Sequence, residues 1–262
     1  RPPPPTDTRQ LLRDRGVWAP LGVAVMLNFA WYLQGDFLYT VLIVSFGQSI
    51  TAATRITGLY SFASVLTGVL VGAVVYRVRR LKPFIVTGTL LFLLAFGLLV
   101  RFRGGAAGRA DAVGLIAAQI LLGVAGGFFP FAALASIQTA TPHEHLAAVT
   151  ALYLASYHVG AALGNCVSGA VWSNSLPAQL ASSLRSTLPD GEATALAAAI
   201  YADPLSSFPT SYPWGTPERV AVASAYRAVQ RNLCLTGLAL CVPLIGFALL
   251  VRNPRLTGAQ SL

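Results

Sequence analysis

The sequence predicts an all-α membrane protein, a bundle of six transmembrane helices, from its apolar stretches and its composition. Each stretch is about 20–30 residues long, and about 20 apolar residues in a helix cross a ~30 Å hydrocarbon core. The stretches are continuous rather than alternating, which favours helices over the strands of a barrel. The chain is 55% hydrophobic and 10% charged, whereas soluble domains carry about 25% charged residues. The stretches are Trp18–Phe46, Ala52–Tyr76, Pro83–Val100, Ala112–Ile137, Leu146–Trp172 and Ala225–Val251.

The chain begins at Arg1 and continues with Pro2–Pro5, without a Met or a signal-peptide pattern. A proline-rich segment of this kind is extended and solvated. We expect residues 1–15 to be a cytosolic linker that follows an upstream segment, so that the chain is a fragment of a longer protein. Transmembrane helices one to five then occupy residues 16–172.

Lys and Arg residues gather in the short segments between the stretches, where they indicate the cytosolic side of a membrane. The net charge of +9 would suggest a nucleic-acid partner in a soluble protein, but at helix ends it is a topology signal, and we expect no nucleic-acid partner. The larger group comprises Arg9, Arg13, Arg15, Arg77, Arg79, Arg80, Lys82, Arg252 and Arg255. The opposite segments hold Arg55, Arg101, Arg103 and Arg109. This distribution predicts cytosolic termini, a cytosolic tail over residues 252–262, and a role in topology or gating for Arg55, Arg79 and Arg80.

One connection, residues 173–224, is far longer than the usual loop of ~4–6 residues. We expect an extracellular or luminal loop here, followed by the last transmembrane helix over residues 225–251. Within it Ala178–Leu188, bounded by prolines, has a helical pattern, and aromatic residues then stand among prolines. Two interpretations stay open: a lid that packs on the helix ends, or a surface that contacts substrate through Tyr212 and Trp214.

Polar residues of the first stretch share one predicted helical face. Asn28, Tyr32, Asp36 and Tyr39 are spaced by four, four and three residues, which aligns them on a helix. A partly desolvated carboxylate could exchange a proton during transport, so we predict that Asp36 couples transport to protons and that Tyr32 and Tyr39 bind substrate. The other interpretation is that Asp36 lies at the headgroup boundary and caps the helix or pairs with Arg55.

A second polar stripe follows the fifth stretch at helical spacing. Hydroxyls, an amide and large rings on one face suit a cavity that holds a large polar ligand, and we predict that Tyr157 and Asn165 bind substrate. The same residue types also form hydrogen bonds between transmembrane helices, which is the interpretation we favour for His158. The stripe consists of Tyr153, Tyr157, Ala161, Asn165, Ser168 and Trp172.

Glycine pairs at GxxxG spacing occur in three stretches and predict close helix packing. The pairs are Gly68 and Gly72, Gly123 and Gly127, and Gly160 and Gly164. Gly126, Gly127 and Pro130 together also predict a bend.

The sequence provides no pattern for an enzyme, a cofactor or a metal centre. A Walker-type glycine loop, a nucleophile elbow and paired catalytic carboxylates are absent from the sequence, so this chain would not power transport with bound ATP. The trio His143, Glu144 and His145 occupies adjacent positions that do not converge on a metal. Cysteines at positions 166, 234 and 241 are interpreted as small apolar packing residues.

Several local patterns resemble those of known transporters. The turn Tyr76–Pro83 resembles the basic cytosolic turn found in each half of major facilitator transporters, which have two six-helix halves. A more specific set of segments resembles the fungal siderophore–iron transporters, and this resemblance extends over residues 8–262. The segments are Tyr32–Leu42, Ala53–Ile56, His143–Ala147, Gly169–Trp172, Leu176–Pro177, Gly215–Arg219, Tyr226–Arg227 and Arg252–Thr257.

The resemblance implies that the chain is the C-terminal six-helix half of a proton-coupled importer of ferric siderophores, chiefly hydroxamates. Its partners would be the ferric siderophore, protons, the lipid bilayer and a missing N-terminal half. The fungal plasma membrane or an endosomal membrane would contain it, and the long outer loop would handle ligand. Two alternatives stay open: a drug or glutathione proton antiporter of the same superfamily, and a receptor-like membrane protein that transports nothing.

Overall fold

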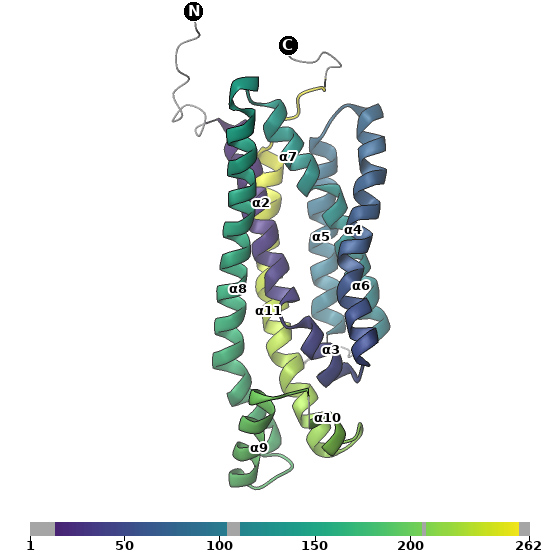
Figure 1. The fold of residues 1–262 in the computed structure, drawn as a ribbon, viewed down its shortest axis with the longest axis vertical. Helices are drawn as coiled ribbons and strands as arrows, with labels where there is room; N and C mark the ends of the chain where they lie inside the picture. Colours follow the sequence, from purple (N-terminus) through teal and green to yellow (C-terminus); the bar gives the residue numbers. More distant parts are fainter. Residues whose placement is uncertain (1–13, 104–110, 206–207, 257–262) are drawn as a thin grey trace, which may run out of the picture.

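The structure, a computed structural model, describes residues 14–103, 111–205 and 208–256 and is an all-α bundle (Figure 1). Six spans in this part are long and apolar enough to cross a membrane, which confirms the predicted number of helices. Helix α2 begins at the end of the bundle where α11 ends. The proline-rich segment, the end of the tail, and Arg9, Arg13 and Arg109 lie outside the described residues.

The first span consists of two helices. Helix α2 covers Arg15–Gly35 and α3 covers Leu38–Phe46, with Asp36 and Phe37 in the break between them. Helix α3 ends at Gly47, whose φ of 63° is the left-handed conformation that glycine adopts without a steric penalty. The apolar stretch predicted as one helix therefore crosses as one span but changes direction near its polar residues.

The fourth span is also divided, which confirms the bend predicted near Pro130. Phe129 separates α6 from α7, and the hydroxyl of Tyr153 donates a hydrogen bond to the carbonyl of Pro130 at 2.7 Å. The elements after the first span are α4 Ile50–Val78, α5 Lys82–Phe102, α6 Ala112–Phe128, α7 Pro130–Thr139, the short η1 His143–His145, α8 Leu146–Leu184, α9 Asp190–Ala202, α10 Phe208–Ser211 and α11 Pro217–Leu250.

The basic turn between α4 and α5 is fastened to the end of the chain. The carbonyl of Arg79 accepts a hydrogen bond from the backbone N–H of Leu256 at 2.9 Å. The ammonium of Lys82 donates to the carbonyl of Leu249 at 2.6 Å. Arg80 is exposed. This turn thus ties the second and third spans to the last one, in addition to carrying the predicted topology signal.

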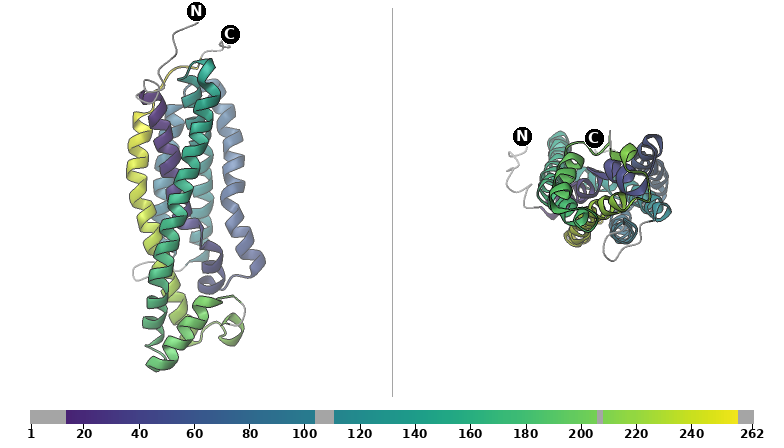
Figure 2. Two further views of the ribbon diagram at one scale, coloured as in Figure 1. Left: turned by 60° about the vertical axis from the view of Figure 1, so that its left-hand side comes forward. Right: turned by 90° about the horizontal axis from the view of Figure 1, so that it is seen from below.

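The connection expected as a long loop is largely helical. Helix α8 continues to Leu184 and α11 begins at Pro217, so both extend beyond the other helices, and α9 and α10 pack at this end (Figures 1 and 2). Residues 172–205 and 208–229, called the cap below, contribute most of an apolar core that also includes Leu33, Val41 and Val44 of the first span. Its buried members include Trp172, Leu176, Leu180, Leu184, Ala193, Ala197, Ile200, Phe208, Ala221, Val222, Ala225, Tyr226 and Val229.

The helical pattern predicted over Ala178–Leu188 is confirmed as far as Leu184, but Pro177 does not bound it, because α8 passes through this proline without a break. A proline inside a helix costs about 3 kcal/mol. Leu176, Leu180 and Leu184 follow one another at four-residue spacing and are all buried in the cap core. Burial of each leucine contributes about 1.5–3 kcal/mol, so their combined burial outweighs the penalty from the proline.

Glycines bring neighbouring helices into backbone contact. This confirms the close packing that the GxxxG pairs in α6 and α8 predict. A Cβ atom on Gly160 would lie 2.2 Å from the carbonyl oxygen of Val25 in α2. One on Gly123 would lie 2.6 Å from the carbonyl oxygen of Tyr60 in α4. The pair in α4 is used less, because a Cβ on Gly72 would meet nothing within 4 Å. Close packing is therefore concentrated in the α2–α8 and α4–α6 contacts.

Replacing Gly160 with Ala should destabilise the bundle by about 1–3 kcal/mol, because backbone atoms of α2 block the added methyl group. Gly169→Ala in the same helix is the matched control, since its Cβ would meet nothing within 4 Å and alanine is the better helix former by about 1 kcal/mol. Thermal unfolding of the purified variants in detergent measures both effects. Equal melting temperatures for the two variants would contradict the close α2–α8 contact.

Candidate functional site

The carboxylate of Asp36 lies at the break in the first span and accepts hydrogen bonds from α8. The hydroxyl of Ser168 donates to one oxygen of Asp36. With the Asn165 amide turned so that its nitrogen faces the carboxylate, this nitrogen lies 2.9 Å from both Asp36 oxygens. Ser168 is buried, whereas Asp36 and Asn165 are exposed on the surface of the bundle. The two predicted polar stripes therefore meet at this point.

The contact between α2 and α8 also brings together predicted tyrosines. A Cβ on Gly164 would lie 2.5 Å from the Cβ of Tyr32, so the two helices touch here. One turn earlier the side-chain amide of Asn28 donates to the carbonyl of Tyr157 at 2.9 Å. Tyr32 and Tyr157 are both half-buried. We call the set Tyr32, Asp36, Tyr157, Asn165 and Ser168 the α2–α8 seam.

Tyr39 does not belong to the seam, because the break interrupts the helical face after Asp36. It lies in α3 and packs against a small apolar cluster that includes Leu42 and Ile56. Arg55 is exposed near the start of α4. No ion pair joins Arg55 to Asp36 among the described residues, so the proposed pairing of these two side chains is not formed.

Gln34, which lies just before the break, accepts hydrogen bonds from side chains of α6 and α11 and from the residue that ends α5. Arg103 at the end of α5 donates to the carbonyl of Gln34 at 2.8 Å and also to its side-chain oxygen. Gln119 of α6 donates to the same side-chain oxygen at 3.0 Å. Gln230 of α11 donates to the carbonyl at 2.9 Å. These four residues are the Gln34 network below.

The sequence analysis missed this network because it treated Arg103 as an exposed topology signal. The side chain is instead fully buried, with 0% of its surface exposed. A helix that ends leaves its last carbonyls without intrahelical partners, and the network supplies partners where α2 ends at the break. Gln34 and Gln119 are amides within apolar stretches, and polar side chains in spans usually have a partner. These two positions could therefore have indicated a buried polar contact.

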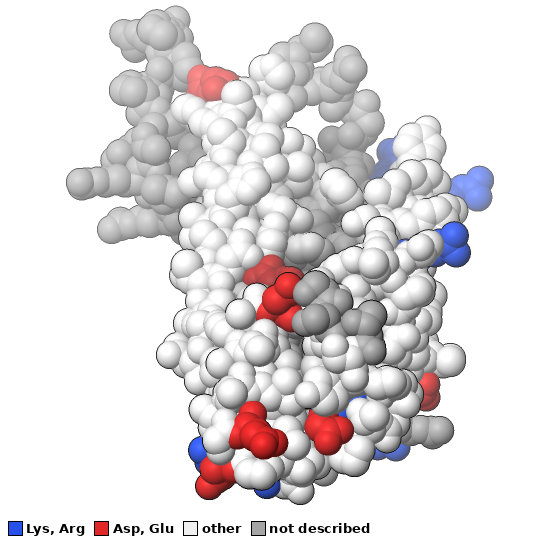
Figure 3. All heavy atoms as spheres, turned by 60° about the horizontal axis from the view of Figure 1, so that its bottom comes forward, with Lys and Arg blue, Asp and Glu red and all other residues white. Residues whose placement is uncertain are grey.

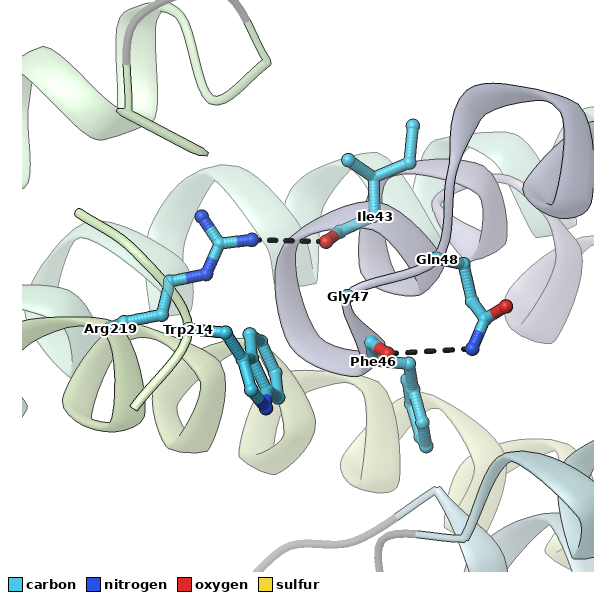
Figure 4. Close-up of a pocket in the computed structure, with 6 residues that line it drawn as sticks. All are labelled: Ile43, Phe46, Gly47, Gln48, Trp214 and Arg219. Atoms are coloured by element: carbon cyan, nitrogen blue, oxygen red, sulfur yellow. Dashed lines mark hydrogen bonds between the residues drawn. The ribbon is translucent and has the colours of Figure 1, made fainter. Parts of the chain in front are cut away.

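A separate cavity of about 310 Å³ lies between the end of α3 and the start of α11 (Figure 4). Arg219 donates from Nη2 to the carbonyl of Ile43 at 3.1 Å, and the Gln48 amide donates to the carbonyl of Phe46 at 3.4 Å. We call this cavity the α3–α11 pocket. It is lined by Ile43, Phe46, Gly47, Gln48, Trp214 and Arg219.

The two aromatic residues predicted in the cap have different positions. Trp214 lines the pocket, is 58% exposed, and lies 3.5 Å from where a Cβ on Gly47 would be. Tyr212 is half-buried, and its ring centroid lies 5.3 Å from that of Phe208, which belongs to the cap core. Trp214 is thus available to a ligand, while Tyr212 supports the cap. Arg219, which the sequence analysis did not select, completes the pocket.

Comparison with known proteins shows that the chain is similar to several fungal siderophore transporters. The chain is 44% identical to Siderophore iron transporter 1 of Saccharomyces cerevisiae over 98% of its own length. It is 40% identical to Siderophore iron transporter ARN1 of the same yeast over 95% of its length. It is 28% identical to MFS siderochrome iron transporter C of Aspergillus fumigatus over 97% of its length. The chain spans 40%, 38% and 40% of these relatives, respectively.

The fold agrees with a match to a family model. No solved structure matches the chain. The model described as Major Facilitator Superfamily matches residues 8–180, which include the broken first span, the basic turn and the α2–α8 seam. With this match and six membrane-spanning helices in its described part, the chain belongs to the Major Facilitator Superfamily.

Proposed function

We propose that this chain is the C-terminal six-helix half of a transporter that imports ferric siderophores into a fungal cell with the uptake of protons. The observation that carries the proposal is the 44% identity to a siderophore iron transporter over 98% of the chain. The protein would lie in the plasma membrane or an endosomal membrane with both termini in the cytosol. The cap would then face the exterior or the lumen.

The seam has the chemistry that a ferric siderophore requires. A hydroxamate siderophore surrounds iron with its own oxygens, so its carrier needs no metal ligands. It needs rings, hydroxyls and amides that contact the outside of the chelate. Tyr32, Tyr157 and Asn165 provide these groups, and all three retain exposed surface. An N-terminal half would cover this side and enclose the ligand between the two halves.

The surroundings of Asp36 support a role in proton coupling. Its hydrogen-bond partners, Ser168 and Asn165, are neutral. A hydroxyl and an amide can each donate to a carboxylate or accept from a carboxylic acid, so both protonation states can be satisfied. A cationic partner would have held the carboxylate ionised instead. Asp36 can thus gain and lose a proton while its partners remain in place.

Uptake of radiolabelled ferric hydroxamates tests the proposed function. The gene that encodes the chain is expressed at its full length in a yeast strain without siderophore transporters of its own. We expect uptake that increases as the external pH is lowered. Absence of uptake, together with export of a toxic compound, would identify a drug antiporter and contradict the proposal.

Asp36→Asn should lower uptake by about tenfold or more, because the variant loses a charge-assisted interaction and cannot carry a proton. It should also flatten the dependence of uptake on external pH, because the variant has no carboxyl group that can bind and release a proton at this position. Asp190→Asn is the control, since Asp190 is an exposed acid of the cap that pairs with Arg185 at 3.2 Å. A normal pH profile in Asp36→Asn would show that this carboxylate is structural.

Trp214→Ala should raise the apparent KM for uptake severalfold with little change in the maximal rate, because the pocket loses an aromatic wall. Tyr212→Ala should instead lower the amount of folded protein at the membrane, since its ring packs against Phe208. Uptake kinetics normalised to surface protein separate the two effects. Unchanged kinetics in Trp214→Ala would show that the cap covers the helix ends without contacting the ligand.

A further inference from the structure

The α3–α11 pocket contains a buried cation with unused hydrogen-bond donors. Arg219 is only 4% exposed. Its Nη2 donates to the carbonyl of Ile43, whereas Nε and Nη1 have no hydrogen-bond partner among the described residues. A buried charged group that is not fully paired is costly, and each unsatisfied donor adds to that cost. The guanidinium therefore has free N–H donors for an acceptor atom of a ligand.

Aromatic rings hold this guanidinium without using those donors. Its central carbon lies 4.9 Å from the ring centroid of Phe208 and 5.4 Å from that of Trp214. Cation–π contacts of this kind contribute about 0.5–2 kcal/mol, which offsets part of the free-energy cost of desolvating the guanidinium. They also fix the plane of the guanidinium at the pocket. Figure 4 shows the side chain directed toward the turn at Gly47.

A second arginine adds positive charge beside the pocket. Arg227 lies two turns further along α11, donates to the carbonyl of Ser45, and stands 5.3 Å from the ring centroid of Phe46. Its Nε also lacks a partner. Both arginines thus hold the last turn of α3 through its free carbonyls. Each guanidinium donates only one of its N–H groups to that turn and retains at least one other that has no partner among the described residues.

None of the described residues that line the pocket is acidic. Figure 3, which brings the cap end forward, shows acidic groups on the outside of the cap instead. Asp190 at the start of α9 is exposed and pairs with Arg185. The charge balance at the pocket is therefore positive, while the exterior of the cap is mixed. Selection of an anion would depend on the local donors rather than on long-range attraction.

We propose that the α3–α11 pocket binds a carboxylate carried on an arm of the ferric siderophore, an inference that rests on the proposed function. The unpaired N–H groups of Arg219 would donate to the carboxylate. Trp214 and Phe46 would flank the carbon chain of the arm, and the Gln48 amide would contact its polar atoms. A volume of about 310 Å³ is at the lower limit for a small-molecule site, so it accommodates an arm and not a whole chelate.

The test compares two probes with the same iron-binding groups, of which one has anionic arms and the other neutral arms. The first is a ferric trihydroxamate whose arms end in carboxylates, and the second is its methyl ester. Full-length protein in the transporter-deficient yeast should take up the acid with a half-saturation concentration about tenfold lower than that for the ester. Arg219→Gln should remove this difference, while Arg185→Gln, which also removes one positive charge from the cap, should retain it.

Arg219→Lys covers the case in which Arg219→Gln does not fold. It keeps a positive charge but lacks the planar set of donors, so the preference for the acid should fall to about threefold. Equal uptake of acid and ester by the unchanged protein, or a full preference in Arg219→Lys, would overturn the inference and leave siderophore import intact. Uptake of neither probe, nor of a neutral trihydroxamate, would overturn the proposed function as well.

Discussion

The break in the first span is the constraint on which the rest of the bundle depends. Backbone groups freed from a helix inside a membrane must find partners, because no water is available to them. At this break Arg103 at the end of α5 and Gln230 of α11 donate to the backbone carbonyl of Gln34, and Gln119 of α6 donates to its side-chain oxygen. On the opposite side α8 satisfies the carboxylate of Asp36. Side chains from four other helices therefore converge on one interruption.

The approach of α8 to α2 is what allows short side chains to reach the break. Packed helices usually lie 8–10 Å apart, a distance set by the side chains between them. Gly160 and Gly164 remove those side chains, and the backbone of α2 takes their place. Ser168, one turn beyond Gly164, can then place a hydroxyl against Asp36. The glycine pair and the polar seam are thus parts of one arrangement, since a bulkier residue would separate the carboxylate from its partners.

Much of the fold could be predicted from the sequence, because hydropathy and glycine spacing act locally along each span. The number of spans, the bend at Pro130 and the close contact at Gly160 all follow from such patterns. The Gln34 network could not be predicted in this way, since the partners of Arg103 come from distant helices. The path of α8 through Pro177 was missed for a related reason. Only the assembled cap shows how much burial its leucines gain and why the proline is tolerated.

Helix α3 lies between Asp36 of the α2–α8 seam and the α3–α11 pocket. It has nine residues and is therefore about 13 Å long at 1.5 Å per residue. Asp36 stands before its first turn, and its last turn is held by Arg219 and Arg227. An anion on the unpaired N–H groups of Arg219 would share the guanidinium with the carbonyl of Ile43 and so change how firmly the end of α3 is held. Protonation of Asp36 would replace charge-assisted hydrogen bonds to α8 with weaker neutral ones, while the partners stay in place at this other end. Ligand and proton would then act on one short rigid element, which is the physical requirement for coupling their free energies.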